Sequence, residues 1–541
     1  MLAGAMKKAA AAAFFIFAAG IAQARDALVA REFMVAAAHP LAAQAGYDVL
    51  ARGGSAVDAA IAVQLVLGLV EPESSGIGGG AFLLHWSQRE QRLRSYDGRE
   101  TAPAAARRER FLDAQGNAVA FHEAVLGGRS VGVPGVLRML ELAHRRHGRL
   151  PWAELFRSAI DLAEHGFALS PRLHALLDAE RDLRDDPAAR AVYYGKTVGE
   201  RIVNPQYAAT LRAIAANGAS VFYEGAIAAD IVRAVHMHRK AGDLTTADVA
   251  AYQAREREPL CGAYRVWRIC SMGPPSSGGV GVLQILGILE RTRFVLAPPQ
   301  SAQALHYFSE AGRLAYADRA RYLGDPDVVP VPLARLLAPG YLAQRARLIG
   351  ERAMRRAAPG DMENGTSHFS IVERNGDAVA MTTTIEAGFG SRIMARGFLL
   401  NNELTDFDFV PGGPNEVGPG KRPRSSMAPA MVFDADGRLQ LIVGSPGGSA
   451  IINYVAKALV GVLDWKLDIQ AAIDLPNFGA RYGPTEIEAG SRYQALAGGL
   501  IERGHEVELA PLESGLHGIE RVPGGWRGGA DPRREGVAKG R

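Results

Sequence analysis

The chain has 541 residues, of which 48% are hydrophobic and 22% charged, and its 61 basic and 57 acidic residues leave a formal net charge of +4. This length supports a large buried core and excludes a disulfide-stabilised miniprotein, while the balance of apolar and charged residues excludes an intrinsically disordered chain. A net charge of +4 over this length is too small to indicate a nucleic-acid-binding face. The sequence therefore predicts a large globular protein whose function has to be sought in local motifs.

The first 24 residues have the pattern of a secretory leader. Lys7 and Lys8 precede an apolar run over 9–22, and small residues at Ala22 and Ala24 match the cleavage site of a signal peptide. The run is short for a membrane-spanning helix, and no other stretch approaches ~20 uninterrupted apolar residues. We expect cleavage after Ala24, no membrane span in the mature protein, and a periplasmic or secreted location.

A helix, a glycine loop and a strand are predicted in succession after the leader. Ser55 with Asp58 three residues later is typical of a capping box, and residues 57–70 are nearly all apolar, which predicts a buried helix. The glycine-rich stretch 76–80 then leads into the apolar, strand-like residues 81–84. This order and the glycine spacing do not fit a nucleotide-binding fingerprint.

Residues 137–260 have a mostly helical pattern and carry no motif that indicates chemistry. Two histidine pairs within this segment lack a Glu or Cys at metal-ligand spacing, so we expect no metal site. Cys261 and Cys270 then flank a strand-like segment. One disulfide bridge and two buried thiols are both compatible with their spacing and with export.

A hairpin is predicted over residues 368–384, with Asn375-Gly376 as its turn signal. A three-residue loop places Thr366 directly across from Thr384, whereas a two-residue loop puts Thr384 on the opposite face. The sequence leaves both registers open.

A second hairpin, over residues 431–443, runs into the glycine-rich stretch 444–449 and the start of an apolar helix. A strand, a glycine turn and a helix start aim free backbone N–H groups at a negative ligand atom. No Lys-Ser or Lys-Thr follows, which argues against a nucleotide loop. An oxyanion hole and a tight turn without a ligand remain as the two interpretations.

Six motifs occur in a fixed order along the chain. They are DGRETAP at 97–103, PPSSGG at 274–279, TSHFS at 366–370, NNELTDF at 401–407, RPRSSM at 422–427 and GSPGG at 444–448. Together they resemble the γ-glutamyltransferase (γ-glutamyltranspeptidase) family, and the match runs from about His39 to near the C-terminus. The resemblance implies the N-terminal nucleophile hydrolase fold, an α+β architecture with a four-layer αββα sandwich that forms one domain from two chains.

The resemblance also implies a precursor that cuts itself between Gly365 and Thr366. The products are a large subunit of residues 25–365 and a small catalytic subunit of residues 366–541, which form a heterodimer. The Thr366 hydroxyl attacks the Gly365 carbonyl, and water opens the resulting ester. The freed α-amine titrates at roughly 7.7–8.0, so it can act as the general base for the hydroxyl of the same residue.

The resemblance assigns two further catalytic roles by position. Thr384 is implied to hydrogen-bond the hydroxyl of the Thr366 nucleophile, which the three-residue loop permits. Gly447 and Gly448 are implied to form the oxyanion hole, in which a donor is usually worth about 3–4 kcal/mol of barrier. We expect no metal or cofactor in this chemistry.

A third set of implied roles concerns the amino-acid head of the substrate. Arg99 is implied to hold the α-carboxylate through its bidentate fork, with Ser425 and Ser426 as hydroxyl partners. Glu403 and Asp406 are implied to receive the α-ammonium. These roles favour glutathione and other γ-glutamyl compounds as donors, with water, amino acids or peptides as acceptors.

Two departures from the family pattern keep other interpretations open. Glu386 stands where many members have an asparagine, so it adds a third carboxylate near the ammonium pocket or faces solvent. The stretch 407–424 is short and lacks the longer lid of some members, and an open site admits bulkier substrates. A cephalosporin (glutaryl) acylase of the same fold is therefore the alternative, although unpaired carboxylates at Glu403 and Asp406 repel a glutaryl carboxylate.

A non-catalytic periplasmic binding protein of two lobes is the alternative from another class, and it predicts an uncut chain.

Overall fold

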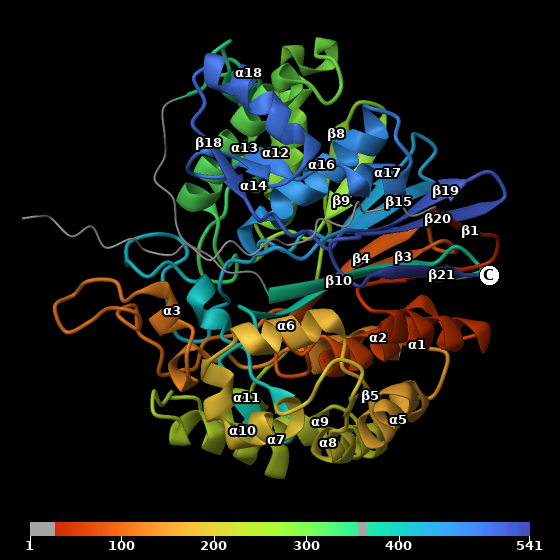
Figure 1. Cartoon of the computed structure of the whole chain (residues 1–541), viewed down its shortest axis with the longest axis vertical. Helices are drawn as coiled ribbons and strands as arrows, with labels where there is room; N and C mark the ends of the chain where they lie inside the picture. The colour runs from red at the N-terminus through yellow and green to blue at the C-terminus, as the bar shows by residue number, and fades with distance from the viewer. Residues whose placement is uncertain (1–26, 355–364) are drawn as a thin grey trace, which may run out of the picture.

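A computed structural model describes residues 27–354 and 365–541 of the chain (Figure 1). The predicted leader and its cleavage site after Ala24 lie outside the described residues. In the described part of the chain, no helix combines the length and the apolar character that crossing a bilayer requires.

Two seven-stranded antiparallel sheets form the centre of the molecule. The first has the order β21 (Val537–Gly540), β2 (Met34–Ala37), β10 (Gly365–Val372), β11 (Ala378–Glu386), β3 (Gly80–Ser87), β4 (Arg92–Gly98) and β7 (Arg255–Arg257). The second has the order β1 (Leu28–Ala30), β20 (Gly525–Ala530), β19 (His517–Val522), β15 (Leu439–Gly444), β14 (Ala430–Phe433), β9 (Trp267–Ser271) and β8 (Leu260–Tyr264).

The two sheets share a buried apolar cluster. Met34, Trp86 and Ala380 of the first sheet pack in it with Met431 and Phe433 of the second. Because side chains alternate between the faces of a strand, each sheet has a second apolar face that other elements must cover.

Helices cover these outer faces (Figure 1). Against the first sheet pack α1 (Pro40–Ala51) and α2 (Ala56–Val70), and against the second pack α12 (Gly278–Leu289) and α16 (Ile451–Leu463). The long helix α13 (Ala302–Tyr322) packs on α12. The molecule is a mixed α/β fold with antiparallel sheets. The capping box of Ser55 and Asp58 begins α2, whose residues are all buried except Gly68, so the predicted buried helix is confirmed.

The predicted helical region, residues 137–260, is confirmed. It contains α4 (Val136–His147), α5 (Arg157–His165), α6 (Pro171–Ala179), α7 (Pro187–Tyr193), α8 (Pro205–Asn217), α9 (Ser220–Tyr223), α10 (Ala226–Met237) and α11 (Thr246–Ala250). The remaining α-helices are α3 (Phe121–Ala124), α14 (Leu333–Leu336), α15 (Pro339–Ala346), α17 (Ile469–Asp474) and α18 (Ala497–Glu502). Smaller sheets are formed by β5 (Phe167–Ala168) with β6 (Arg201–Ile202), by β12 (Met394–Ala395) with β13 (Phe398–Leu399), and by β16 (Phe478–Ala480), β17 (Thr485–Glu488) and β18 (Val507–Ala510).

The structure decides two questions that the sequence left open. Thr366 pairs directly with Thr384 across β10 and β11, which is the register of the three-residue loop, and Gly376 supplies the positive φ of +89° that this loop needs. Cys261 and Cys270 lie opposite each other on β8 and β9 and form a disulfide bridge.

Candidate active site

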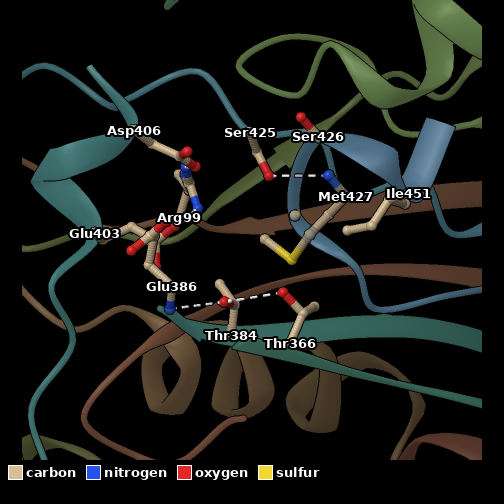
Figure 2. A pocket seen from close by; sticks show the side chains of 11 residues that line it. Arg99, Thr366, Thr384, Glu386, Glu403, Asp406, Ser425, Ser426, Met427 and Ile451 are labelled. Atoms are coloured by element: carbon tan, nitrogen blue, oxygen red, sulfur yellow. Dashed lines mark hydrogen bonds and ion pairs between the residues drawn. The ribbon is translucent and has the colours of Figure 1, made fainter. Parts of the chain in front are cut away.

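A pocket at one end of β10 and β11 gathers the predicted residues from distant parts of the chain (Figure 2). Its lining consists of Arg99, Thr366, Thr384, Glu386, Glu403, Asp406, Ser425, Ser426, Met427, Gly448 and Ile451. Of the predicted site residues, Gly365 and Gly447 are not part of the lining, but each directly precedes a residue that is. The cavity measures about 20 Å³, room for about one water molecule, because side chains fill most of it.

Thr366 and Thr384 are positioned by the pairing of β10 with β11. The Thr366 Oγ1 lies 2.7 Å from the carbonyl oxygen of Gly365 and 3.3 Å from the Thr384 Oγ1. The Thr384 hydroxyl donates to the same Gly365 oxygen at 2.7 Å and accepts a hydrogen bond from the backbone N–H of Glu386 at 2.8 Å, an arrangement that is visible in part in Figure 2. The carbonyl ahead of Thr366 is therefore polarised by a hydroxyl that the backbone helps to orient.

The backbone around residue 365 leaves no room for a side chain, so this position requires glycine. A Cβ at this position would approach the Glu386 carbonyl oxygen to 2.5 Å and the Gly388 nitrogen to 2.8 Å, which are backbone atoms that cannot yield easily. On the other side of the bond, the Arg534 guanidinium donates to the Thr366 carbonyl oxygen at 3.1 Å. The peptide link between Gly365 and Thr366 is thus held from both sides.

Gly447 and Gly448 form the turn between β15 and α16. Their φ angles of +134° and +52° lie in the region that favours glycine, and a Cβ on Gly447 would approach the Tyr454 ring to 2.5 Å. Neither amide N–H donates a hydrogen bond to a group within residues 27–354 or 365–541. Free N–H groups at the start of a helix, beside Thr366, match an oxyanion hole.

Arg99 lies at the centre of the charged side of the pocket and is fully buried. Its Nε donates to the Pro423 carbonyl oxygen at 3.0 Å, and its two terminal nitrogens bind Glu403 and Asp406, the latter at 2.5 Å. The guanidinium fork is therefore engaged by the two acids that the family resemblance assigns to the ammonium. A zwitterionic head can enter by exchange, with its carboxylate on Arg99 and its ammonium on the released acids.

Acidic side chains outnumber basic ones in the lining of this pocket. Burial raises the pKa of Glu403 to about 7, although Arg99 opposes the shift, and burial together with Asp406 and Glu403 raises the pKa of Glu386 well above its usual range. Burial likewise raises the pKa of Glu100, a neighbour of Arg99. A raised pKa means that ionisation of these acids is unfavourable in this pocket, so a nearby cation such as an α-ammonium would stabilise their ionised form.

Glu386 faces the pocket and not solvent. Its Oε2 accepts hydrogen bonds from the Asn402 side-chain nitrogen at 2.6 Å and from the Thr405 hydroxyl at 3.1 Å. Its φ of +77° is rare for a residue with a side chain, and such strain persists where the surrounding structure demands it.

Ser425 and Ser426 line the same pocket. The Ser425 Oγ accepts from the Met427 N–H at 3.1 Å, and the Ser426 Oγ accepts from Arg319 at 2.9 Å. A hydroxyl that already accepts a hydrogen bond keeps its own proton for a carboxylate.

Sequence reasoning missed several residues that shape the site. Arg319 lies in the last turn of α13, where no local pattern marks it, yet it also donates to the Ser277 hydroxyl at 2.8 Å. Glu100 lies inside the DGRETAP motif directly after Arg99, and that position was the available signal. Met427 and Ile451 supply the apolar part of the lining.

Comparisons with known proteins agree with this geometry. A family model described as Gamma-glutamyltranspeptidase matches residues 42–541. The glutathione hydrolase proenzyme of Bacillus subtilis (strain 168) is 36% identical over 95% of this chain and 92% of its own length, and that of Escherichia coli (strain K12) is 36% identical over 93% and 91%. The crystal structure of cephalosporin acylase from Bacillus halodurans superimposes with a TM-score of 0.86 at 28% identity, covering 96% of this chain and 97% of that one. The chain therefore belongs to the gamma-glutamyltranspeptidase family.

Proposed function

We propose that this protein is a self-processing γ-glutamyltransferase and glutathione hydrolase that is exported to the periplasm or the exterior after loss of residues 1–24. The observation that carries the proposal is the contact of the Thr366 hydroxyl with the Gly365 carbonyl oxygen, at 2.7 Å, in a pocket that also holds Arg99 and buried acids. The relatives named above are proenzymes, which supports division into residues 25–365 and 366–541.

The finer fold assignment belongs to the same proposal. Two sheets that share a core and carry helices on their outer faces support a four-layer αββα sandwich of the N-terminal nucleophile hydrolase type. In that arrangement, Thr366 becomes the first residue of the small subunit and lies at the end of a central strand.

Processing begins when the Thr366 Oγ adds to the carbonyl carbon of Gly365. The Thr384 hydroxyl stabilises the developing oxyanion, the C–N bond breaks, and the proton of the Thr366 hydroxyl ends on the released nitrogen. Water then hydrolyses the ester, which leaves a carboxylate on Gly365 and a free α-amine and hydroxyl on Thr366. Residue 366 thus acquires its base in the same event that separates the subunits.

In turnover, the Thr366 α-amine takes the hydroxyl proton while the Oγ attacks the γ-carbonyl carbon of the donor. The N–H groups of Gly447 and Gly448 stabilise the oxyanion, and the leaving amine departs with the proton from the Thr366 ammonium. Water or an acceptor amine then attacks the γ-glutamyl ester and regenerates the hydroxyl. Arg99 and the acids orient the donor head throughout.

A cephalosporin (glutaryl) acylase is the second candidate, because the Bacillus halodurans acylase shares the fold over nearly the whole chain. A glutaryl group lacks the α-ammonium, so Glu403 and Asp406 would face its carboxylate side without a cation between them. The surplus of acids in the pocket therefore favours the γ-glutamyl donor.

The deciding experiment compares hydrolysis of glutathione and of glutaryl-7-aminocephalosporanate by the same purified protein. We expect kcat/KM for glutathione to exceed that for the glutaryl compound by at least about tenfold, which corresponds to about 1.4 kcal/mol of transition-state binding. Faster turnover of the glutaryl compound would establish the acylase, and no turnover of either by a chain that stays uncut would favour the binding protein.

The pH dependence of KM provides a second prediction. The pKa of Glu403 is raised to about 7, so below that pH the acid is protonated and cannot pair with the donor ammonium. We expect KM for a γ-glutamyl anilide to fall about tenfold from about pH 6 to about pH 8, as ionised Glu403 accumulates. Initial-rate kinetics across this range measure the effect.

Two variants test this assignment. Glu403→Gln should flatten the KM profile because no titrating group remains at that position, while Glu416→Gln, in a loop outside the pocket lining, should preserve it. A profile in Glu403→Gln that still falls tenfold would show that another group controls donor binding.

A further inference from the structure

A separate small apolar cluster lies directly behind the acids of the pocket. We name it the aromatic clamp, and it is defined by Ala102, Ala106, Phe111, Val119, Phe121 and Ala124 of the large-subunit part and Leu404, Phe407, Phe409 and Val417 of the small-subunit part. It is distinct from the cores of the two sheets.

Stacked rings join the two parts of the clamp. The ring of Phe409 lies 4.6 Å from that of Phe111 and 6.2 Å from that of Phe121, with interplanar angles of 23° and 17°. Phe111 has no exposed surface, although it belongs to a loop that is otherwise mostly exposed and that ends in α3, at the edge of the molecule in Figure 1. A buried ring in an exposed loop indicates a contact that anchors the loop.

The clamp is coupled to the pocket through a single turn of 3₁₀ helix, η5 (Glu403–Asp406). Leu404 of this turn is fully buried in the clamp, whereas Glu403 and Asp406 on either side of it bind Arg99. Phe407 follows at once and is also buried in the clamp. This short turn therefore directs two acids toward Arg99 and two apolar side chains into the clamp.

This restraint matters because the acids repel one another. Besides burial, the charges of Asp406 and Glu403 raise the pKa of Glu386, and the charge of Asp406 raises the pKa of Glu403. Arg99 holds both acids from the pocket side, and once a donor carboxylate takes Arg99, the other contacts of the turn must keep the acids in place. Polar ties hold the turn at the Glu403 N–H, which donates to Asn401 at 3.0 Å, and at the Asp406 carbonyl oxygen, which accepts from Asn415 at 2.8 Å. The Thr405 hydroxyl adds a bond to Glu386 at 3.1 Å, and the apolar contacts of Leu404 and Phe407 with the clamp add to these ties.

We propose that the aromatic clamp makes the pocket selective for donors that carry an α-ammonium. Phe111, Phe121 and Phe409 are positioning residues that hold Glu403 and Asp406 where the ammonium binds. This inference rests on the proposed function and adds to it the residues that set head-group selectivity from outside the pocket.

The test uses two anilides that differ only in the α-ammonium, γ-glutamyl-4-nitroanilide and glutaryl-4-nitroanilide. In Phe111→Ala, we expect KM for the γ-glutamyl anilide to rise about tenfold with kcat within about twofold, and kcat/KM for the glutaryl anilide to change by less than about twofold. Phe111→Leu should restore most of the selectivity. Denaturing electrophoresis first establishes that each variant is processed. If Phe111→Ala is not processed, the same comparison is made with Phe121→Ala, a milder change because the Phe121 ring is only half-buried.

The control is Phe294→Ala, which removes a buried ring that packs near Trp465 in a different core. It should leave the ratio of the two kcat/KM values unchanged. An unchanged KM in the clamp variants, a parallel loss for both anilides, or the same selectivity change in Phe294→Ala would overturn the inference. Failure of the wild-type protein to hydrolyse the γ-glutamyl anilide would instead refute the proposed function.

Discussion

Replacement of Thr366 by alanine should leave the chain uncut and inactive. The Thr366 Oγ1 is the atom placed at 2.7 Å from the Gly365 carbonyl oxygen, and removing it eliminates both the processing nucleophile and the one that attacks the donor. Denaturing electrophoresis and intact mass measurement should show one polypeptide in place of two fragments of unequal size, and turnover of a γ-glutamyl anilide should fall below detection.

A neighbouring threonine serves as the control for this prediction. Thr383 lies one residue before Thr384 on β11, points to the other face and donates to the Gly80 carbonyl oxygen at 3.3 Å. Thr383→Ala should still be processed, and Thr366→Ser should be processed because it retains a hydroxyl. Two fragments from Thr366→Ala would refute self-cleavage at this bond.

Replacement of Gly447 by alanine should greatly reduce kcat while processing continues. The new Cβ meets the Tyr454 ring at 2.5 Å and occupies a residue with φ of +134°, so the turn must shift and its N–H groups move away from the donor oxyanion. Loss of an oxyanion-hole donor lowers kcat by about 10²–10³, or about 3–4 kcal/mol of barrier. KM should change little, because this turn does not hold the amino-acid head.

Processing should survive because the Gly365 carbonyl oxygen is bound by the Thr384 hydroxyl and not by this turn. Gly437→Ala is the matched control, since its φ is +80° and a Cβ there meets nothing within 4 Å. That variant should retain wild-type kcat. A kcat within about twofold of wild type in Gly447→Ala would remove this turn from the catalytic mechanism.

The pairing of charges in the pocket determines which donor can enter. Arg99 is satisfied by Glu403 and Asp406, so the buried guanidinium, the buried Glu403 carboxylate and the partly exposed Asp406 carboxylate all have partners before the substrate arrives. A zwitterionic head replaces each of these interactions with an equivalent one. A substrate that carries only the carboxylate would take Arg99 and leave the acids unpaired, which is the physical basis of the expected selectivity.

Local signals are sufficient to predict several elements of the fold. The capping box of Ser55 and Asp58 and the apolar run after it determine α2, because helix caps and helical burial depend on residues within one or two turns. The turn at Asn375 and Gly376 likewise determines that a hairpin forms. The order of the six short motifs along the chain is enough to identify Thr366 and the head-group residues as candidates.

Other features depend on residues far apart in the chain. Neighbouring residues are enough to predict the two hairpins and the glycine turn of Gly447, whereas the candidate nucleophile follows from the family resemblance of the six motifs. The facing of Thr366 and Thr384, the bridge between Cys261 and Cys270, and the support of Ser426 by Arg319 emerge only in the folded molecule. The reason is that pairing register and buried contacts across long sequence separations follow from packing of the whole fold.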